Sequence, residues 1–510
     1  MAHLGSRRRR ALALPAGLAL TASLGFLPAG TASAAVTDDV AAAVQTDGPK
    51  LSYVVNVKGG HGTSKAVKKA IAKAGGSIVH AYDQIGVIVV HSQNPAFAET
   101  IRQVRGVQSA GATRTAPLAP VADTAIESER PLTAEEAKAA AGQAAAGQDA
   151  LEPLQWDLPA IKADKAHEKT LGSRKVTVAV IDTGVDDTHP DLAPNFDREA
   201  SVSCVGGVPD TADGAWRPGP TESDHGTHVA GTIAAAKNGT GITGVAPGVK
   251  VSGIKVSQPD GFFYTEAVVC GFVWAAEHGV DVTNNSYYTD PWLFNCKNDA
   301  DQAALIESHR RAIRYAESKG AVNVAAAGNS RMDLASDELT DTSSPNDTTP
   351  VERKVNPAEC LDIPTQIPGV VTVSALGAKN LKSSYSNYGN GVIDISAPGG
   401  DATRYQAPAA PAVDGRILST LPGGGFGYKA GTSMASPHVA GVAALIKSTH
   451  PYASPAMVKA LLSVQADDTA CTNPYDIDNN GTVDAVCEGD EDENGFYGEG
   501  VADALDAVRR

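Results

Sequence analysis

Four short segments of the sequence carry residue types that could do chemistry. In VTVAVIDTG, the carboxylate of Asp182 ends a strand-like run just before a glycine turn. In HGTHVAGT the imidazole of His225 could act as a base, and in AAAGNS the amide of Asn329 could donate to an oxyanion. In GTSMASPHVAGVAAL the hydroxyl of Ser433 stands just before an apolar helix, whose N-terminus favours developing negative charge. We expect Pro437 in the first turn of that helix, where no N–H donor is needed.

Each of these residues also has an ordinary structural interpretation. A carboxylate such as Asp182 often caps a loop or binds a metal, and Asn329 could simply form a turn. Ser433 could be no more than a helix N-cap. His225 and His228 could be a zinc pair, but the segment lacks the glutamate and the i, i+4 spacing of H-E-x-x-H, so we expect His228 to be structural. No single motif therefore identifies a reaction.

Strand-like apolar runs alternate with helical segments from residue 151 onward, and these elements must position the four motifs. Alternation of this kind predicts a parallel sheet with helices on both faces. In such a sheet the functional residues lie at the carboxyl ends of the strands. The expected strands are 176–181, 251–256, 280–283 and 321–327, and the expected helices are 225–236, 265–278 and 300–319.

Taken together, the four motifs resemble those of the subtilisin-like serine proteases, or subtilases. The segment GTSMASPHVAG at 431–441 is highly specific, and the chain order Asp182, His225, Ser433 is the subtilase order. The resemblance covers nearly all of residues 151–510, which implies a subtilisin-like α/β catalytic domain over that range. It also implies an enzyme that hydrolyses protein or peptide substrates and needs no cofactor for catalysis.

The resemblance implies a role for each catalytic residue. Ser433 would attack the peptide carbonyl, His225 would accept its proton and pass it to the leaving amine, and Asp182 would orient the imidazole. Asn329 and the backbone N–H of the same serine would form the oxyanion hole. His438, which follows the nucleophile, is expected to be structural.

The substrate-binding segments depart from the common subtilase pattern. A Ser-Leu-Gly segment usually lines the cleft, but here Ser286 is followed by Tyr287 and Tyr288. Tyr288 in place of glycine removes or crowds the backbone edge with which an extended substrate pairs. These three residues and Gly328 are expected at the substrate-binding site, without a side-chain preference that can be transferred from the family. The long connection 330–368 could either pack against the rim or shape the cleft.

Calcium is the expected structural ion, with two candidate sites. The resemblance implies one at Asp191 in HPDL and Asn238 in the loop before GVAP. The other has oxygen ligands at alternate positions around a glycine turn, as in the first half of an EF-hand loop, but Cys487 replaces the closing glutamate. An acidic, solvated loop is an equal alternative there. The candidate ligands of this second site are Asp476, Asp478, Asn480 and Asp484.

Three segments precede the catalytic range. Residues 1–34 have a basic run, a mainly apolar stretch and an Ala-Ser-Ala end, which predicts a signal peptide and secretion. Residues 35–115 hold a core at 48–115 with the order strand, helix, strand, strand, helix, strand, which favours a ferredoxin-like α+β domain. This core resembles the subtilase propeptide, which implies an intramolecular inhibitor and chaperone. Residues 116–150 have linker composition, and the linker is expected to contain or adjoin the maturation site.

Composition and charge exclude several classes of protein. The chain has 510 residues with 42 Lys and Arg against 58 Asp and Glu, and its net charge of −16 argues against a nucleic-acid partner. No apolar run of about 20 residues recurs, which argues against a membrane protein or a stable anchor.

Residues 48–115 carry nine basic and two acidic residues, whereas residues 151–510 carry 27 basic and 47 acidic residues. This contrast favours electrostatic docking of the first segment on the second, although two independently solvated surfaces would look the same.

The cysteines and the predicted signal peptide lead to one interpretation of the whole chain. Export would allow the six cysteines to form disulfides, and Cys471 with Cys487 is the favoured pair because the two are close in sequence. We interpret the chain as a secreted, monomeric serine endopeptidase made as an autoprocessed zymogen. The alternatives are a processing protease of narrow specificity and a catalytically silent peptide-binding protein on the same fold.

Overall fold

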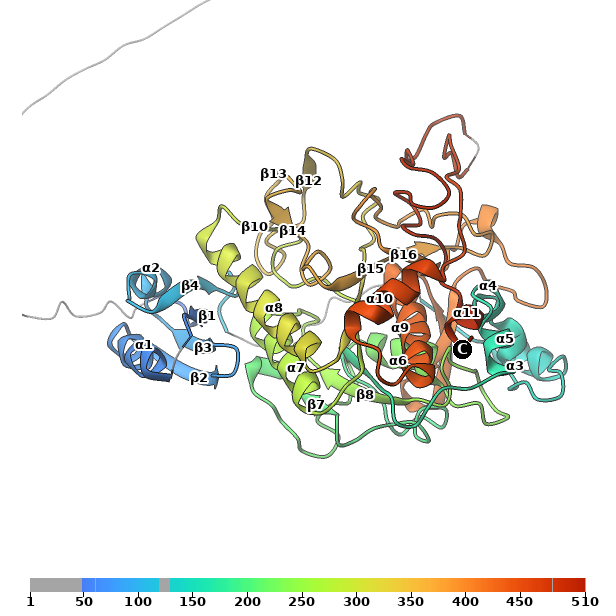
Figure 1. The fold of residues 1–510 in the computed structure, drawn as a ribbon, viewed down its shortest axis with the longest axis horizontal. Helices are drawn as coiled ribbons and strands as arrows, with labels where there is room; N and C mark the ends of the chain where they lie inside the picture. Colours follow the sequence, from blue (N-terminus) through green and yellow to red (C-terminus); the bar gives the residue numbers. More distant parts are fainter. Residues whose placement is uncertain (1–47, 60, 119–128, 479, 510) are drawn as a thin grey trace, which may run out of the picture. The chain divides into compact units, whose positions relative to one another are not determined.

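A computed structural model describes residues 48–59, 61–118, 129–478 and 480–509 of the chain (Figure 1). The expected signal peptide lies outside these residues. Within the described ranges, every helix is too short or too polar to cross a membrane. Two parts are distinguished below: the N-terminal module, residues 48–118, and the main body, residues 129–509.

The N-terminal module is a four-stranded antiparallel sheet with two helices. The strand order β2-β3-β1-β4 confirms the predicted ferredoxin-like fold of this segment. Alternate side chains of β1 belong to two cores: Tyr53 and Val55 pack with α1 and α2, whereas Val54 packs with the main body. The elements are β1 (Leu51–Val57), α1 (His61–Lys73), β2 (Gly76–Tyr82), β3 (Val87–Ser92), α2 (Phe97–Arg102) and β4 (Val107–Ala112).

The main body is built on a seven-stranded parallel sheet in the order β16-β15-β11-β9-β6-β8-β7. Side chains of the central strand β6 alternate between two layers, with Val178 and Val180 beside α6 and α9, and Ala179 and Ile181 beside α7. Helices cover both faces of the sheet (Figure 1), which confirms the prediction.

The expected ranges agree to within two residues with β6, β8, β9, β11, α6, α7 and α8, and no range was expected for the other elements. The strands are β6 (Thr177–Asp182), β7 (Val202–Ser203), β8 (Lys250–Lys255), β9 (Val282–Asn285), β11 (Val322–Ala326), β15 (Val370–Leu376) and β16 (Ile395–Pro398). The helices are α4 (Asp157–Ala160), α5 (Ala163–His167), α6 (His225–Ala234), α7 (Thr265–Glu277), α8 (Ala300–Ser318), α9 (Thr432–Thr449), α10 (Pro455–Val464) and α11 (Ala504–Ala507). Short 3-10 turns occupy Glu152–Leu154, Val205–Gly207, Arg404–Gln406 and Pro422–Gly424.

The long connection 330–368 folds onto the rim and also shapes the cleft. It contains β12 (Leu339–Asp341) paired with β13 (Arg353–Val355), and β14 (Cys360–Leu361) paired with β10 (Asn295–Cys296). A disulfide joins the cysteines of the second pair. Side chains of this connection line the pocket described below, so both of the roles considered for it apply.

The second half of the expected linker, residues 129–150, is ordered against the rest of the main body, which its composition did not predict. β5 (Arg130–Pro131) extends the antiparallel pair β17 (Ile417–Leu421) and β18 (Gly425–Lys429). α3 (Ala134–Ala141) begins with a capping box and buries Ala140 against the main body. Backbone pairing and small alanine side chains make these contacts, so a search for large apolar residues misses them.

All six cysteines form disulfides, which fits an oxidising compartment. The pair favoured from the sequence is present, and the other two bridges join the residue that follows β7 to α7 and β10 to β14. The three bridges are Cys204–Cys270, Cys296–Cys360 and Cys471–Cys487.

Candidate active site

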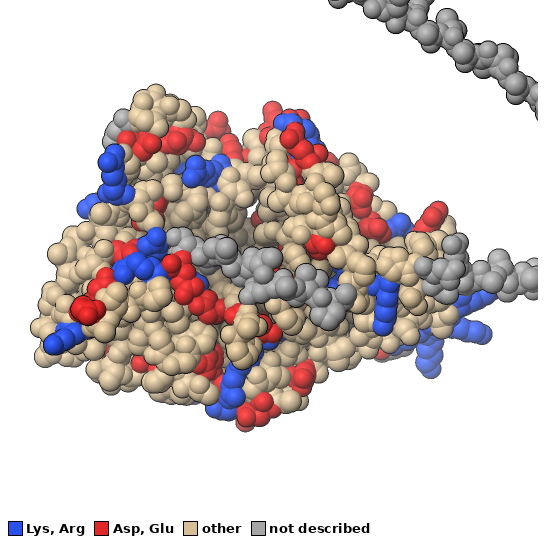
Figure 2. All heavy atoms as spheres, turned by 180° about the vertical axis from the view of Figure 1, so that it is seen from behind, with Lys and Arg blue, Asp and Glu red and all other residues tan. Residues whose placement is uncertain are grey.

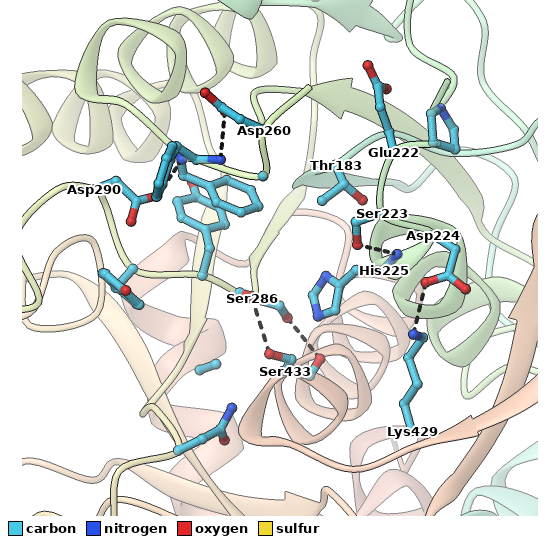
Figure 3. A pocket seen from close by; sticks show the side chains of 18 of the residues that line it. Thr183, Glu222, Ser223, Asp224, His225, Asp260, Ser286, Asp290, Lys429 and Ser433 are labelled. Atoms are coloured by element: carbon cyan, nitrogen blue, oxygen red, sulfur yellow. Dashed lines mark hydrogen bonds and ion pairs between the residues drawn. The ribbon is translucent and has the colours of Figure 1, made fainter. Parts of the chain in front are cut away.

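The carboxyl ends of the central strands and the first residues of two helices meet at one pocket (Figure 3). β6 ends at Asp182, while Ser286 follows β9 and Asn329 follows β11. His225 begins α6, and Ser433 lies in the first turn of α9. Because parallel strands bring their carboxyl ends to the same edge of a sheet, the four motif residues come together as predicted.

A hydrogen bond joins His225 to Asp182. The Nδ1 atom of His225 lies 2.7 Å from Oδ1 of Asp182, whose side chain is fully buried. The backbone N–H of Thr183 donates to the same oxygen at 2.7 Å and fixes the carboxylate. A side chain at Gly226 would come 2.4 Å from the carbonyl oxygen of Gly184, so glycine is needed for α6 to start this close to β6. A carboxylate held on Nδ1 leaves Nε2 as the atom that can accept a proton.

Ser433 is held at the start of α9 by Ser286. Ser286 Oγ donates to the carbonyl of Ser433 at 2.9 Å, and Ser433 Oγ donates to the carbonyl of Ser286 at 3.3 Å (Figure 3). The prediction that Pro437 lies in the first turn is wrong, because the helix begins at Thr432 and the proline falls in its second turn. There a residue with an N–H would bond the carbonyl of Ser433, and proline has none. The Ser286 hydroxyl supplies the missing donor.

Asn329 is oriented as a hydrogen-bond donor. Its Oδ1 accepts hydrogen bonds from the backbone N–H and the hydroxyl of Thr432, at 2.8 and 2.9 Å. The NH2 end of the amide is therefore turned away from Thr432 and is the group that can meet an oxyanion. Gly328 has a φ of +97°, and a side chain there would come 2.5 Å from the amide nitrogen of Asn387. Glycine is thus required beside Asn329.

The other two histidines of the motifs are structural, as expected. His228 is fully buried, and its Nε2 lies 3.1 Å from the carbonyl oxygens of Ile417 and Gly427, which ties α6 to β17 and β18. Burial lowers the pKa of His228 well below its ordinary value, so the ring stays neutral. His438 Nε2 contacts the carboxylate of Asp157 at 3.0 Å. Both histidines hold packed elements together, and neither is one of the residues that line the pocket.

Tyr287 and Tyr288 line one wall of the pocket. The ring of Tyr287 stacks on that of Phe263, with centroids 4.6 Å apart and planes parallel to within 1°. The hydroxyl of Tyr288 accepts a hydrogen bond from the side-chain amide of Asn346 at 2.9 Å, which ties this wall to the connection 330–368. Burial raises the pKa of both tyrosines. The wall that a Ser-Leu-Gly segment would leave open is therefore aromatic here.

Asp191 and Asn238 lie together, and Asp149 joins them. The amide of Asn238 donates to Oδ1 of Asp191 at 3.1 Å, and the N–H of Ile242 donates to Oδ2 at 2.9 Å. The carboxylate of Asp149 accepts the backbone N–H of Asn238 at 3.1 Å and that of Gly239. Sequence analysis missed Asp149 because it falls in the expected linker.

This cluster has the chemistry of a hard cation site. Burial raises the pKa of Asp149 and of Asp191, and the charge of Asp149 raises that of Asp191 further. A Cβ at Gly241 would come 1.9 Å from Oδ2 of Asp191, so the loop closes tightly around the carboxylates. Carboxylate and amide oxygens held by such a loop fit calcium.

The second candidate metal site is brought together only in part. Asp476, Asp478 and Asp484 have carboxylate oxygens within 4.8 Å of one another. The backbone N–H groups of Asn480 and Gly481 donate to Asp476 at 3.0 and 2.7 Å. The side chain of Asn480 accepts the N–H of Thr482 instead of joining the carboxylates. The loop thus satisfies several of its acidic oxygens by itself.

The pocket also contains acidic residues that the sequence analysis did not single out. Asp290 is buried, and burial raises its pKa to about 7. Asp362 lies in the connection 330–368 and is buried as well. Neither residue belongs to a recognisable motif, so only the tertiary structure assigns them to the site.

Comparisons with known proteins agree with this geometry. The chain matches the sequence profile of the subtilase family (peptidase S8) over residues 173–500. Subtilisin BL of Lederbergia lenta is 32% identical over 320 residues, which are 63% of this chain and 94% of that protein. Subtilisin E of Bacillus subtilis strain 168 is 33% identical over 311 residues, which are 61% of this chain and 65% of that protein.

Solved structures share the fold. The crystal structure of an epidermin leader peptide processing serine protease (EpiP) from Staphylococcus aureus has a TM-score of 0.64 and 23% sequence identity. The match covers 90% of this chain and 98% of that one.

Proposed function

This chain belongs to the subtilase family of serine proteases, and we propose on that premise that it is a secreted endopeptidase made as a zymogen that processes itself. The observation that carries the proposal is that His225, Asn329 and Ser433 line one pocket, while the buried carboxylate of Asp182 is hydrogen-bonded to His225. These groups supply a nucleophile, a base, a carboxylate that orients the base and a donor for an oxyanion, which is the set that peptide hydrolysis requires.

In the acylation step, Ser433 Oγ attacks the carbonyl carbon of the scissile bond while His225 Nε2 accepts its proton. The Asp182 carboxylate keeps the Nδ1–H tautomer and stabilises the imidazolium without taking the proton. The oxyanion is met by the Asn329 amide and the backbone N–H of Ser433. His225 then protonates the leaving amine, and the acyl group stays on the serine. Water, deprotonated by His225, releases the acid in the second step.

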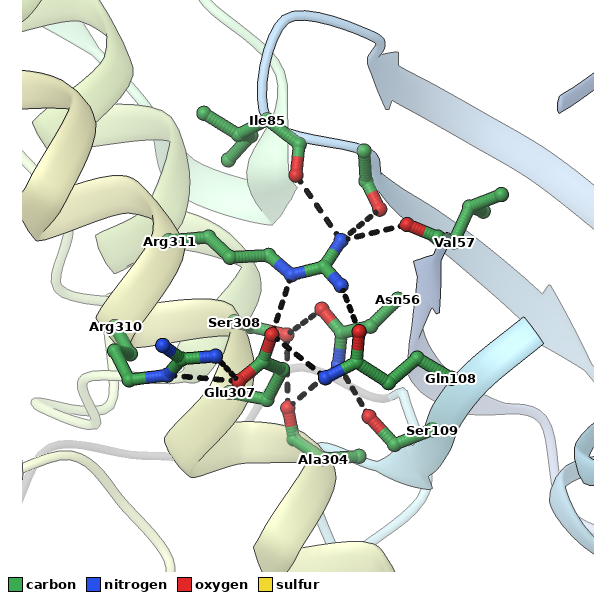
Figure 4. Close-up of polar contacts among 11 residues, drawn as sticks. Asn56, Val57, Ile85, Gln108, Ser109, Ala304, Glu307, Ser308, Arg310 and Arg311 are labelled. Carbon is green, nitrogen blue, oxygen red and sulfur yellow. Dashed lines mark hydrogen bonds and ion pairs between the residues drawn. The ribbon is translucent and has the colours of Figure 1, made fainter. Parts of the chain in front are cut away.

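We propose that the N-terminal module is the inhibitory propeptide, and its contacts with α8 support this role. Arg311 of α8 donates to the backbone carbonyls of Val57, Ile85 and Gly86 at distances from 2.9 to 3.1 Å (Figure 4). The side chain of Asn56 donates to the carbonyl of Ala304 at 2.9 Å. One guanidinium nitrogen, Nη1, reaches all three carbonyls, which come together only in the folded module, so the contact is specific for that fold.

Charge and apolar contact both contribute to this docking. Arg102 pairs with Asp301, and the buried pair Arg114–Glu266 has a distance of 2.8 Å. Figure 2 shows acidic side chains spread over the main body and basic side chains on the module. Apolar side chains of the module, among them Val54, also join the core that α7 and α8 share. The charge contrast is therefore one part of the attraction and the buried apolar surface another.

Maturation is proposed between Thr115 and Glu152. Asp347, next to the pocket residue Asn346, accepts the backbone N–H groups of Thr115 and Ala116 at 2.8 and 3.0 Å. Farther along the chain, Glu129 lines the pocket itself. Contacts at the pocket on either side of residues 119–128 support a cut in this part of the chain by the enzyme's own nucleophile.

We also propose that calcium is structural. Asp149, Asp191 and Asn238 are the first site, and the donor set described above supports it. The cluster of Asp476, Asp478 and Asp484 is the second and weaker candidate.

The test of the proposed function is a fluorophosphonate probe applied to the secreted protein and to a Ser433→Ala variant. We expect the wild type to be labelled once, at Ser433, and to lose the N-terminal module. The variant is expected to remain unlabelled and to keep the module. An unlabelled wild type without its module would contradict the proposal and favour the catalytically silent, peptide-binding alternative.

A processing protease of narrow specificity is the second candidate. Tyr287 and Tyr288 stand where a Ser-Leu-Gly segment would leave an open edge, and Tyr288 is hydrogen-bonded to Asn346 of the connection 330–368, which supports a cleft that accepts few sequences. Digestion of a mixed peptide library separates the candidates, because a broad enzyme cuts many sequences and a processing enzyme cuts few.

A further inference from the structure

Beyond the nucleophile, the pocket has two walls and a floor. The segment 286–288 after β9 is one wall, and 326–328 at the end of β11 is the other. Asp362 lies between them, because the carbonyl of Ile363 accepts the N–H of Thr289, just after the first wall, and the hydroxyl of Thr365 donates to the carbonyl of Ala326 in the second, both at 2.8 Å. Oδ2 of Asp362 lies 3.8 Å from the position that a Cβ on Gly328 would take. The floor is thus within reach of a side chain that enters beside Gly328.

Asp362 is a buried acid whose charge has no partner among the described residues. Its exposed fraction is 2%, and its Oδ1 accepts no hydrogen bond from the part of the chain that the structure describes. Burial raises the pKa of this carboxyl well above its ordinary value. Asp290 of the same pocket differs, since the N–H of Phe263 and the amide of Asn346 bond its two oxygens. Asp362 alone of these two has an oxygen left for a ligand.

The pocket as a whole is acidic. Among the described residues that line it, Lys429 is the one lysine or arginine, and it already pairs with Glu129 at 3.0 Å and Asp224 at 2.9 Å. The remaining acids of the lining are Glu222, Asp260, Asp290 and Asp362. A cationic group entering the pocket meets attraction from several sides.

The proposed mechanism fixes which substrate side chain reaches the floor. The scissile carbonyl lies between Ser433 Oγ and the Asn329 amide, so the side chain of the residue that bears this carbonyl starts beside Gly328. We propose that Asp362 selects lysine or arginine at this position, with its carboxylate paired to the ammonium or guanidinium group. The inference rests on the proposed endopeptidase function and names its substrate class.

The preference for a cation follows from the protonation state of the Asp362 carboxyl, which differs between the empty pocket and the pocket that holds a cation. A carboxylate buried alone is unfavourable, so the group stays protonated until a positive charge enters. A long aliphatic stem with a charged end fills a hollow between an aromatic wall and a glycine wall and delivers the charge to its floor. A neutral or acidic side chain gains nothing from Asp362.

The test uses the enzyme produced from the full chain after it has processed itself, and peptide substrates that differ only in the residue before the scissile bond: arginine, lysine, norleucine or glutamate. We expect kcat/KM for arginine and lysine to exceed that for norleucine by about 30-fold or more, the range of a buried charge pair. In Asp362→Asn, which keeps the size of the side chain, this preference should disappear, so that the ratio of kcat/KM for lysine to that for norleucine falls to about one. Asp260→Asn, at another acid of the same lining, is the matched control and should keep the preference.

The outcomes separate this inference from the proposed function. Fluorophosphonate labelling of each variant at Ser433 shows that the triad is assembled. A labelled wild type that cleaves norleucine as well as lysine overturns the role of Asp362 and leaves the endopeptidase standing. Equal loss of the preference in the Asp260→Asn control would also overturn it, because the selectivity would then come from the general charge of the pocket. A protein that is not labelled and cleaves none of the peptides overturns both.

Discussion

Ser286 and Ser433 hold each other through two reciprocal hydrogen bonds between side chain and backbone. Ser286 Oγ donates to the carbonyl of Ser433 at 2.9 Å, and the nucleophile's own hydroxyl reaches the Ser286 carbonyl at 3.3 Å. Pro437 makes the first bond necessary, because it removes the helical N–H that would otherwise meet the same carbonyl. One serine therefore both lines the substrate cleft and completes the helix that presents the nucleophile.

Replacing Ser286 by alanine should lower the free energy of unfolding by about 1–3 kcal/mol, the cost of leaving a buried acceptor unpaired. The measurement is the denaturation midpoint in a Ser433→Ala background, which prevents self-digestion and keeps the carbonyl of residue 433. The control is the same change in a Pro437→Ala chain, where the restored N–H can bond that carbonyl. A cost equal in both backgrounds would show that the Ser286 hydroxyl does not replace the missing donor.

Removal of calcium should destabilise the protein more as the pH rises. Asp149 and Asp191 have raised pKa values in the folded chain without an ion, so their contribution to stability is present below the ordinary carboxyl range and is lost as they ionise. The difference in Tm between calcium and EGTA is expected to grow from about pH 4 to pH 7.

Two variants identify the site that carries this effect. Asp191→Asn should remove most of the calcium dependence of Tm, whereas Asp484→Asn, in the exposed cluster, should leave most of it. The reverse order would assign the structural ion to the loop around Asp476.

Arg311→Ala should weaken inhibition by the N-terminal module. The guanidinium of Arg311 donates to three carbonyls of the module, so its loss removes a donor that all three share (Figure 4). We expect activity to appear earlier after synthesis, measured as peptide hydrolysis against time with the full chain. Arg310→Ala is the matched control, because Arg310 pairs with Glu307 on its own helix. Equal time courses for the two variants would exclude a specific role for Arg311.

The preference for lysine over norleucine should increase with pH. Burial raises the pKa of the Asp362 carboxyl, so the group is protonated at low pH and ionises as the pH rises, which strengthens the attraction for a cation. The ratio of kcat/KM for the two substrates is the quantity to measure, because the titration of His225 affects both and cancels. In Asp362→Asn the ratio should not depend on pH. A wild-type ratio that falls with pH would contradict the assignment.

The sequence by itself determined the reaction and the elements that carry it. Asp182, His225, Asn329 and Ser433 stand in local motifs, and each motif joins a strand or helix signal to the residue that ends or begins it. Hydrophobic patterns located β6, β8, β9 and β11 of the main sheet and the order of elements in the N-terminal module, because buried positions recur with the period of a helix or a strand. The strands β7, β15 and β16 were not predicted.

Only the tertiary structure decided what depends on contacts between distant segments. Asp149 reaches the loop of Asn238 from a stretch whose composition suggested a linker, and Asp362 forms the pocket floor from a long connection without a motif. Likewise, Ser286 meets the carbonyl that Pro437 leaves unbonded. Such contacts leave no periodic or local signal in the sequence, because their energy comes from chain folding that brings remote polar groups into one buried space.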